Sequence, residues 1–213
     1  MKAPLSAAVG LASAGVAVGI AVGGCSGATS TASRSLSLST PGSDSGAPSV
    51  SPAASADFSA LLIKAGDITQ PADFFTGKPE TGFTAGSPTL NPNGKPGVAA
   101  VFNSQDGSRQ IGDTILVLAD DSAAKSALSA AAAGLGSAVT FPTPQSSTVG
   151  VDGTLVSGTS PDGSKGVTIL LFTEGKAFTT LEFDGAPDDP VAAEFVEEVG
   201  QKQDAVIKAG LSS

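Results

Sequence analysis

Thirty-one consecutive residues near the N-terminus, Ser26 to Ala56, consist almost entirely of small side chains. Apart from Arg34, Leu36, Leu38, Asp44 and Val50, every residue in this stretch is Ser, Thr, Ala, Gly or Pro. Such a segment cannot bury enough apolar area to offset the entropy lost on ordering, so it is predicted to be disordered. The folded part of the chain is therefore expected in residues 57–213.

Residues 1–24 have the plan of a signal peptide, with a single charge at Lys2 followed by an apolar run from Leu5 to Val22. The run approaches the ~20 residues that cross a bilayer, but its repeated glycines disfavour a permanent helix. It ends in Val22, Gly23 and Gly24 before Cys25, which has the form of a bacterial lipobox. We therefore expect cleavage before Cys25 and lipidation of its thiol.

Cys25 is the only cysteine of the chain, so no internal disulfide is possible. A lone cysteine is often a buried apolar residue, but this one lies between a glycine pair and the small-residue segment. Lipidation predicts a domain held at the outer face of the cell membrane by its acyl chains. Residues 25–56 would be a tether spanning ~30 Å.

Composition excludes several functions. The chain has no His, which rules out imidazole bases, His-ligated metals and Ser-His-Asp triads. Twenty acidic residues against eleven basic ones argue against a nucleic-acid partner. We therefore expect no catalytic residues, no metal and no cofactor.

Hydrophobic patterning predicts a single α+β domain in residues 57–213, an antiparallel sheet with helices packed on it. Helices or helical turns are expected at 58–64, 123–135 and 190–210, and strands at 98–103, 110–119, 148–159, 166–173 and 176–184. The last two strands are expected to form the central hairpin of the sheet.

Local signals place the ends of these elements. Asp106-Gly107 predicts a hairpin turn between the first two strands. Asp120-Asp121 and Asp189-Pro190 are predicted to begin the second and third helices, and Gly136 to end the second. Pro142 and Pro144 are expected to break the chain.

One long excursion, Ile68 to Pro96, is rich in Gly and Pro, and long loops inside compact domains are often functional. Phe74, Phe75 and Phe83 in this excursion are candidates for a ligand or partner surface; alternatively, they cover the edge of the core. Arg109 is the only Arg after the tether and is a candidate clamp for a carboxylate or phosphate. Its plainer interpretation is an ion pair with Asp106 or Asp113.

Three other groups of residues have a composition that could form a cation site or a catalytic site. The acids Asp120 and Asp121 are favoured as helix caps over a cation or acid–base site. Asp184, Asp188 and Asp189 lack calcium-loop spacing and are likewise favoured as caps. Ser164-Lys165 has the composition of a nucleophile pair, but adjacent side chains in a turn point apart.

Several stretches together resemble secreted lipoproteins of mycobacteria and their relatives. The stretches are the lipobox, the tether, Leu61 to Ile68, Ile115 to Leu118 with Asp121 to Ala124, and Val199 to Asp204. The nearest groups are the LpqN-like lipoproteins and the extracellular sensor-domain relatives of mycobacterial receptor kinases. The resemblance implies a layered α+β fold, similar to Mog1/PsbP for the LpqN-like group, and a role in envelope binding or sensing. The single cysteine departs from the disulfide pairs of the kinase sensor domains.

The sequence thus predicts a membrane-anchored envelope lipoprotein acting as a non-catalytic binding module for an envelope protein, glycan or lipid. The alternative is a carrier of acyl lipid or another hydrophobic ligand. A carrier predicts an apolar cavity of several hundred Å³ lined by Phe and aliphatic side chains.

Overall fold

Eight strands form one antiparallel sheet in the computed structural model, which describes residues 56–68, 82–189 and 191–212. The first segment holds two short 3-10 turns, η1 (Ser59–Leu61) and η2 (Ala65–Asp67), and the second segment holds a third, η4 (Pro92–Gly94). The strands are β1 (Phe83–Ala85), β2 (Thr89–Leu90), β3 (Gly97–Ser104), β4 (Gln110–Val117), β5 (Thr140–Ser146), β6 (Val151–Thr159), β7 (Gly166–Glu174) and β8 (Ala177–Gly185). The helices are α1 (Asp121–Ala138) and α2 (Ala193–Leu211). This architecture confirms the predicted α+β class.

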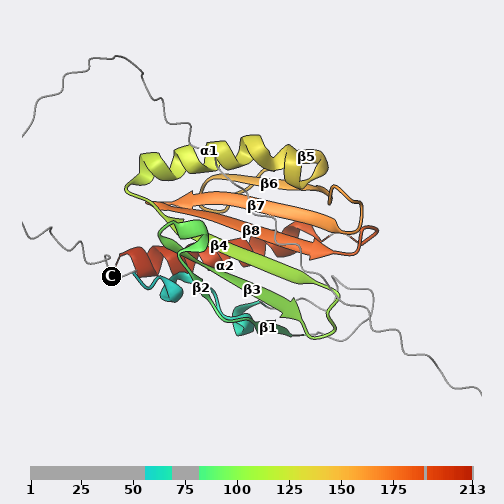
Figure 1. Cartoon of the computed structure of the whole chain (residues 1–213), viewed down its shortest axis with the longest axis horizontal. Coiled ribbons are helices and arrows are strands. Elements are labelled where there is room, and N and C mark those ends of the chain that lie inside the picture. Colours follow the sequence, from blue (N-terminus) through green and yellow to red (C-terminus); the bar gives the residue numbers. More distant parts are fainter. Residues whose placement is uncertain (1–55, 69–81, 190, 213) are drawn as a thin grey trace, which may run out of the picture.

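The strand order across the sheet is β1-β3-β4-β8-β7-β6-β5, with β2 also paired to β3 (Figure 1). The β7–β8 hairpin lies in the middle, as predicted, with Glu174 opposite Ala177 across a two-residue turn. Asp106-Gly107 forms the predicted β3–β4 turn, in which Gly107 adopts a φ of 68°. The Asp106 carboxylate holds this turn by accepting hydrogen bonds from Ser104 and Ser108.

The two helices cover opposite faces of the sheet. Side chains alternate between the faces along a strand, and on β7 both sets are buried. Val167, Ile169 and Leu171 pack in one apolar cluster with α1, whereas Leu170 and Phe172 pack in the larger cluster with α2. In Figure 1, α2 accordingly runs behind the strands. The result is a three-layer sandwich of helix, sheet and helix.

Helix α1 starts where the sequence predicts. The carboxylate of Asp120 accepts a hydrogen bond of 2.8 Å from the Ala123 amide, which confirms its role as an N-cap. The end of the helix is different, because α1 continues through Gly136 to Ala138. Neither α1 nor any other helix in the described ranges is long and apolar enough to cross a membrane.

Helix α2 begins three residues later than predicted. Its N-cap is Ala192, which makes no side-chain capping hydrogen bond, and the Asp189 carboxylate instead binds Arg109. A fully buried amide on α2, Gln203, accepts from the Ile63 amide at 3.0 Å and donates to the Leu61 carbonyl at 2.6 Å. These two hydrogen bonds fix the segment after η1 against α2. The helix expected at 58–64 is only the short turn η1, and the Asp57 carboxylate before it accepts hydrogen bonds from the Ser59 amide and hydroxyl.

Three strands were missed in the sequence analysis. The short strands β1 and β2 lie inside the excursion expected to be irregular. Pro142 and Pro144 do not end the structure but belong to β5, which lies at the edge of the sheet. An edge strand needs backbone donors on one side only, so proline is tolerated there.

One carboxyl group lies inside the larger core. Asp113 of β4 lies on the same face of the strand as Ile111 and Ile115 and is 0% exposed. Ala100 and Leu181 flank it on the neighbouring strands. Neither carboxyl oxygen has a hydrogen-bond partner among the described residues, and the same holds for the Thr179 hydroxyl on the neighbouring strand. Burial raises the pKa of Asp113 to about 8.

Substituting Asp113 with Asn is expected to change how stability depends on pH. The unfolded chain, whose Asp113 has its ordinary pKa of 3.8, binds fewer protons than the native state. Native stability should therefore fall as pH rises from about 4 to about 8, by at most about 1.4 kcal/mol per pH unit. Between pH 5 and pH 7, urea unfolding of the wild type should lose about 2–3 kcal/mol more than unfolding of Asp113→Asn.

The control for this measurement is Asp162→Asn. Asp162 lies in an exposed turn, where hydrogen bonds from Ser160 and Ser164 lower its pKa to about 2. Its removal should leave the difference between pH 5 and pH 7 as in the wild type. An unchanged pH dependence in Asp113→Asn would refute a protonated native Asp113.

Candidate functional site

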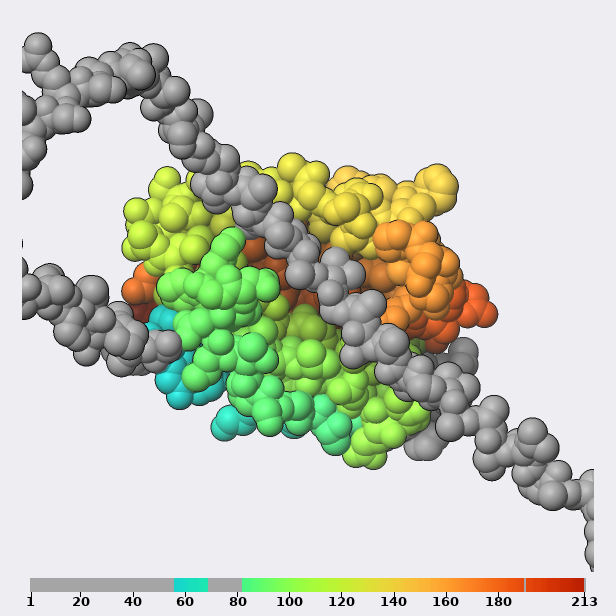
Figure 2. Space-filling model, viewed as in Figure 1, coloured from blue at the N-terminus to red at the C-terminus, as the bar shows by residue number. Residues whose placement is uncertain are grey.

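One face of the sheet is covered only in part. Helix α1 packs against β5, β7 and β8, and its apolar cluster reaches Leu116 of β4 and Phe178 of β8. Beyond Leu116 and Phe178, no helix in the described ranges covers the same face of β3, β4 and β8. In Figure 2 the surface recedes between the yellow-green helix α1 and the green strands below it.

We call this uncovered area the open sheet face. The strand register arranges its side chains in three rows. The first row is Thr84, Asn103, Gln110 and Asp184; the second is Val101, Gly112 and Glu182; and the third is Ala99, Thr114 and Thr180. Asn103 and Val101 are exposed, and the members on β4 and β8 are partly exposed.

Hydrogen bonds hold the first row in place. Gln110 Nε2 donates to Asn103 Oδ1 at 2.9 Å, and Lys165 Nζ donates to Asp184 Oδ2 at 2.7 Å. The other oxygen of Asp184 is buried and has no hydrogen-bond partner among the described residues. The row therefore presents the amides of Asn103 and Gln110, fixed by their hydrogen bond, to a ligand, whereas the Asp184 carboxylate is mostly buried and bound by Lys165.

The second row carries a carboxyl group next to a gap. Burial raises the pKa of Glu182, the negative charge of Asp184 raises it further, and Lys165 opposes the rise. Gly112 lies directly opposite Glu182 in the register. A Cβ atom at Gly112 would have only the Glu182 Cβ within 4 Å, at 3.9 Å. The absence of a side chain at Gly112 therefore leaves a gap in the layer of side chains on this face.

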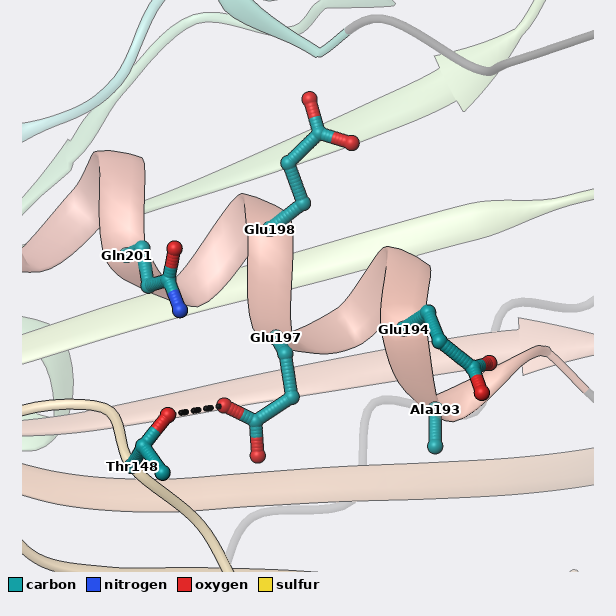
Figure 3. A pocket seen from close by; sticks show the side chains of 6 residues that line it. All are labelled: Thr148, Ala193, Glu194, Glu197, Glu198 and Gln201. Carbon is teal, nitrogen blue, oxygen red and sulfur yellow. Dashed lines mark hydrogen bonds between the residues drawn. The ribbon is translucent and has the colours of Figure 1, made fainter.

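A second concave area lies on the outer side of α2. It has a volume of about 410 Å³ and is lined by Thr148, Ala193, Glu194, Glu197, Glu198 and Gln201 (Figure 3). Glu197 accepts a hydrogen bond from Thr148 at 3.1 Å, and Glu198 pairs with Lys202 at 2.8 Å. Among the described residues, no group of three His, Cys, Asp or Glu is placed to hold a metal ion.

The candidate residues from the sequence lie elsewhere. Phe83 is buried and stacks on Phe195 at 6.5 Å between ring centroids, which is the core-edge position given as the alternative. Phe74 and Phe75 lie outside the described residues, and so do Val22, Gly23, Gly24 and Cys25. Lipidation of Cys25 therefore stays a prediction.

Arg109 is buried and holds a loop. Its side chain is 6% exposed, and Nη2 lies 2.5 Å from Oδ2 of Asp189, a carboxylate that is 67% exposed. Nη1 donates to the Asp189 carbonyl at 3.4 Å. Burial lowers the pKa of Arg109, and the charges of Asp189 and Asp106 oppose this shift. Arg109 is therefore in an ion pair, but with Asp189, which was not among the expected partners Asp106 and Asp113.

The remaining candidates are separated by the fold. Asp184 binds Lys165 and Asp189 binds Arg109, so these acids form no common cation site. Ser164 donates its hydroxyl to Asp162 at 2.8 Å and not to Lys165. The hydrogen bond from Lys165 to Asp184 raises the pKa of that lysine, so its amine stays protonated and is not available to activate a serine.

The open sheet face was missed in the sequence analysis, although a signal was present. In β4, Gln110, Gly112 and Thr114 alternate with buried residues, and in β8 Thr180, Glu182 and Asp184 do the same. Such alternation predicts one solvated face on each strand. Only the pairing of β4 with β8 brings the two solvated faces together.

The protein is thus an α+β sandwich in which the described helices cover one face of the antiparallel sheet only in part. Its fold is similar to that of the extracellular domain of PknH from Mycobacterium tuberculosis, with a TM-score of 0.50 and 8% sequence identity. The match covers 73% of this chain and 95% of that domain. At this identity the likeness concerns the fold, where it agrees with the expected relation to extracellular domains of mycobacterial kinases. The sequence matches no family model, and no curated protein matches it.

Replacing Asp189 with Ala should destabilise the domain by about 1–3 kcal/mol, because the buried Arg109 guanidinium loses its carboxylate. Urea unfolding measures the loss. Asp188→Ala is the matched control, since Asp188 is the exposed neighbour. Equal stabilities of the two variants would show that the ion pair does not hold the loop.

Proposed function

We propose that this chain is a lipoprotein of the cell envelope that displays a non-catalytic binding module at the outer face of the membrane. In this proposal Cys25 carries the acyl chains, residues 26–56 form the tether, and the open sheet face holds the ligand. The partner is a component of the envelope.

The location is supported by two independent features. The leader and the Val22-Gly23-Gly24-Cys25 motif favour export and lipidation. The fold is also that of a domain that is extracellular in another protein. Two or more acyl chains would be needed for a stable anchor, because a single chain binds a membrane only marginally.

The open sheet face is the single observation that carries the binding role. Strands β4 and β8 lie within the sheet and carry the larger apolar core on one side. On the other side they present amide, hydroxyl and carboxyl groups in three registered rows. A face of this kind suits a polar ligand. Of the described Phe rings, six are buried in the two cores, namely Phe83, Phe102, Phe172, Phe178, Phe183 and Phe195. Phe141, which is 87% exposed, lies on the edge strand β5 and not on the open sheet face.

This arrangement favours a surface-binding role over a lipid carrier. The largest fully buried side chains, including Phe102, Phe172, Phe183 and Phe195, pack in the core cluster with α2. Five of the six residues that line the concave area on α2 are polar, three of them glutamates, and Ala193 is the one apolar residue among them. A carrier would hold its ligand between apolar walls.

Cys25→Ala tests the anchor. In a bacterium with a lipoprotein pathway, the wild type should partition into the detergent phase and take up a labelled fatty acid, with an N-terminal mass that includes a diacylglyceryl group. The variant should lose the label because it has no thiol to modify, and Ser26→Ala should keep it. A wild-type protein whose Cys25 is a free thiol would rule out the anchor.

The double variant Asn103→Ala/Gln110→Ala tests the binding face. Detergent-solubilised full-length protein should bind immobilised cell-wall fragments, freed of membrane, at least about tenfold more weakly when these two amides are lost. The control is Glu194→Ala/Gln201→Ala, which removes polar side chains from the other concave area. Equal binding by wild type and the face variant, with unfolding curves matched, would exclude the open sheet face as the site.

A further inference from the structure

The open sheet face has features that select among classes of envelope ligand. Resting on the function proposed above, we infer that its ligand is an uncharged oligosaccharide chain that lies across β3, β4 and β8.

Charge excludes anionic ligands. The face carries two carboxylates, Glu182 and Asp184, against one lysine, Lys165, which is already paired with Asp184 at 2.7 Å. The one Arg after the tether, Arg109, is buried in its contact with Asp189. Phosphate or carboxylate groups would meet repulsion here, and the described residues of this face hold no further lysine or arginine to offset it.

The hydrogen-bonding groups fit sugar hydroxyls, which both donate and accept. After the Gln110–Asn103 hydrogen bond forms, the Asn103 NH₂ group and the Gln110 side-chain oxygen stay available as a donor and an acceptor. Because ordered partners hold these side chains, less entropy is lost on binding.

The spacing of the rows also fits a sugar chain. Neighbouring strands lie about 4.7–4.9 Å apart, close to the length of one pyranose ring. Asn103, Gln110 and Asp184 lie on three successive strands in one row. They are therefore placed to bind consecutive sugar units.

The second row leaves room for a ring. Gly112 has no side chain, and a Cβ there would meet only one atom within 4 Å. Val101, which is 42% exposed, lies beside it and offers an apolar contact to the C–H groups of a sugar.

A peptide ligand is disfavoured by the same face. Peptides bind sheets by adding a strand at an edge or by filling apolar pockets with side chains. The open sheet face lies inside the sheet, and Val101 is its single large apolar side chain that is exposed in the described residues. At the β5 edge, Pro142 and Pro144 lack backbone donors.

The test is a titration of full-length protein in detergent with neutral linear hexasaccharides of glucose, mannose, galactose and arabinose, each used separately. Backbone amide shifts and calorimetry report binding. At least one hexasaccharide should bind, with shifts confined to β3, β4 and β8. Gly112→Val should weaken it at least about tenfold by filling the gap, and Asn103→Ala/Gln110→Ala by a similar factor.

Glu194→Ala/Gln201→Ala is again the control and should bind as the wild type does. A polyanionic hexamer of galacturonic acid should not compete. Absence of binding by all four neutral sugars, or preference for the anionic hexamer, overturns the inference.

The outcome is separable from the proposed function. If cell-wall binding depends on Asn103 and Gln110 but is abolished by protease treatment of the wall and unaffected by the sugars, the ligand is a protein and only the glycan inference falls. If cell-wall binding ignores the face variants, the binding site of the proposed function falls with it.

Discussion

Strand β7 is buried on both of its faces, and this double burial determines the rest of the architecture. Apolar side chains at successive positions, such as Ile169 and Leu170, point to opposite faces, so each face needs its own cover. Helix α1 supplies one cover and α2 the other. A run of this kind in an antiparallel sheet is unusual, because such sheets commonly keep one face in water. The position of β7 therefore determines where the two helices pack, and the other strands are covered only as far as these helices extend.

What remains is unequal on the two faces. The α2 face receives additional cover from the segment around Leu61 and Ile63, which Gln203 holds by two hydrogen bonds. The α1 face has no comparable addition in the described part of the chain, so its cover stops at Leu116 and Phe178. The candidate site is the consequence of this inequality. Asp113 shows how different the two faces of β4 are. Its carboxyl group is fully buried on the α2 face, whereas the opposite face of the same strand belongs to the open sheet face.

Sequence reasoning captured elements whose signals are local. Asp106-Gly107 forms its turn and Asp120 forms its cap because each depends on a few neighbouring residues. Asp189 was wrongly taken as a cap, since a buried Arg109 eighty residues away competes for its carboxylate. Strand β5 was missed because its prolines are acceptable only at an edge, and edge position is a property of the whole sheet. The open sheet face was missed for a similar reason: it needs the register between β4 and β8, which no short motif encodes.

The prolines of β5 affect how the sheet can interact with other copies of the chain. A sheet with two unprotected edge strands can extend by edge-to-edge pairing between molecules, which leads to fibres. Here one edge is formed by β1, only three residues long, and the other by a strand that lacks two of its backbone donors. The described sheet thus offers another chain either a very short edge strand or one with missing donors, so it is poorly suited to growth by edge pairing.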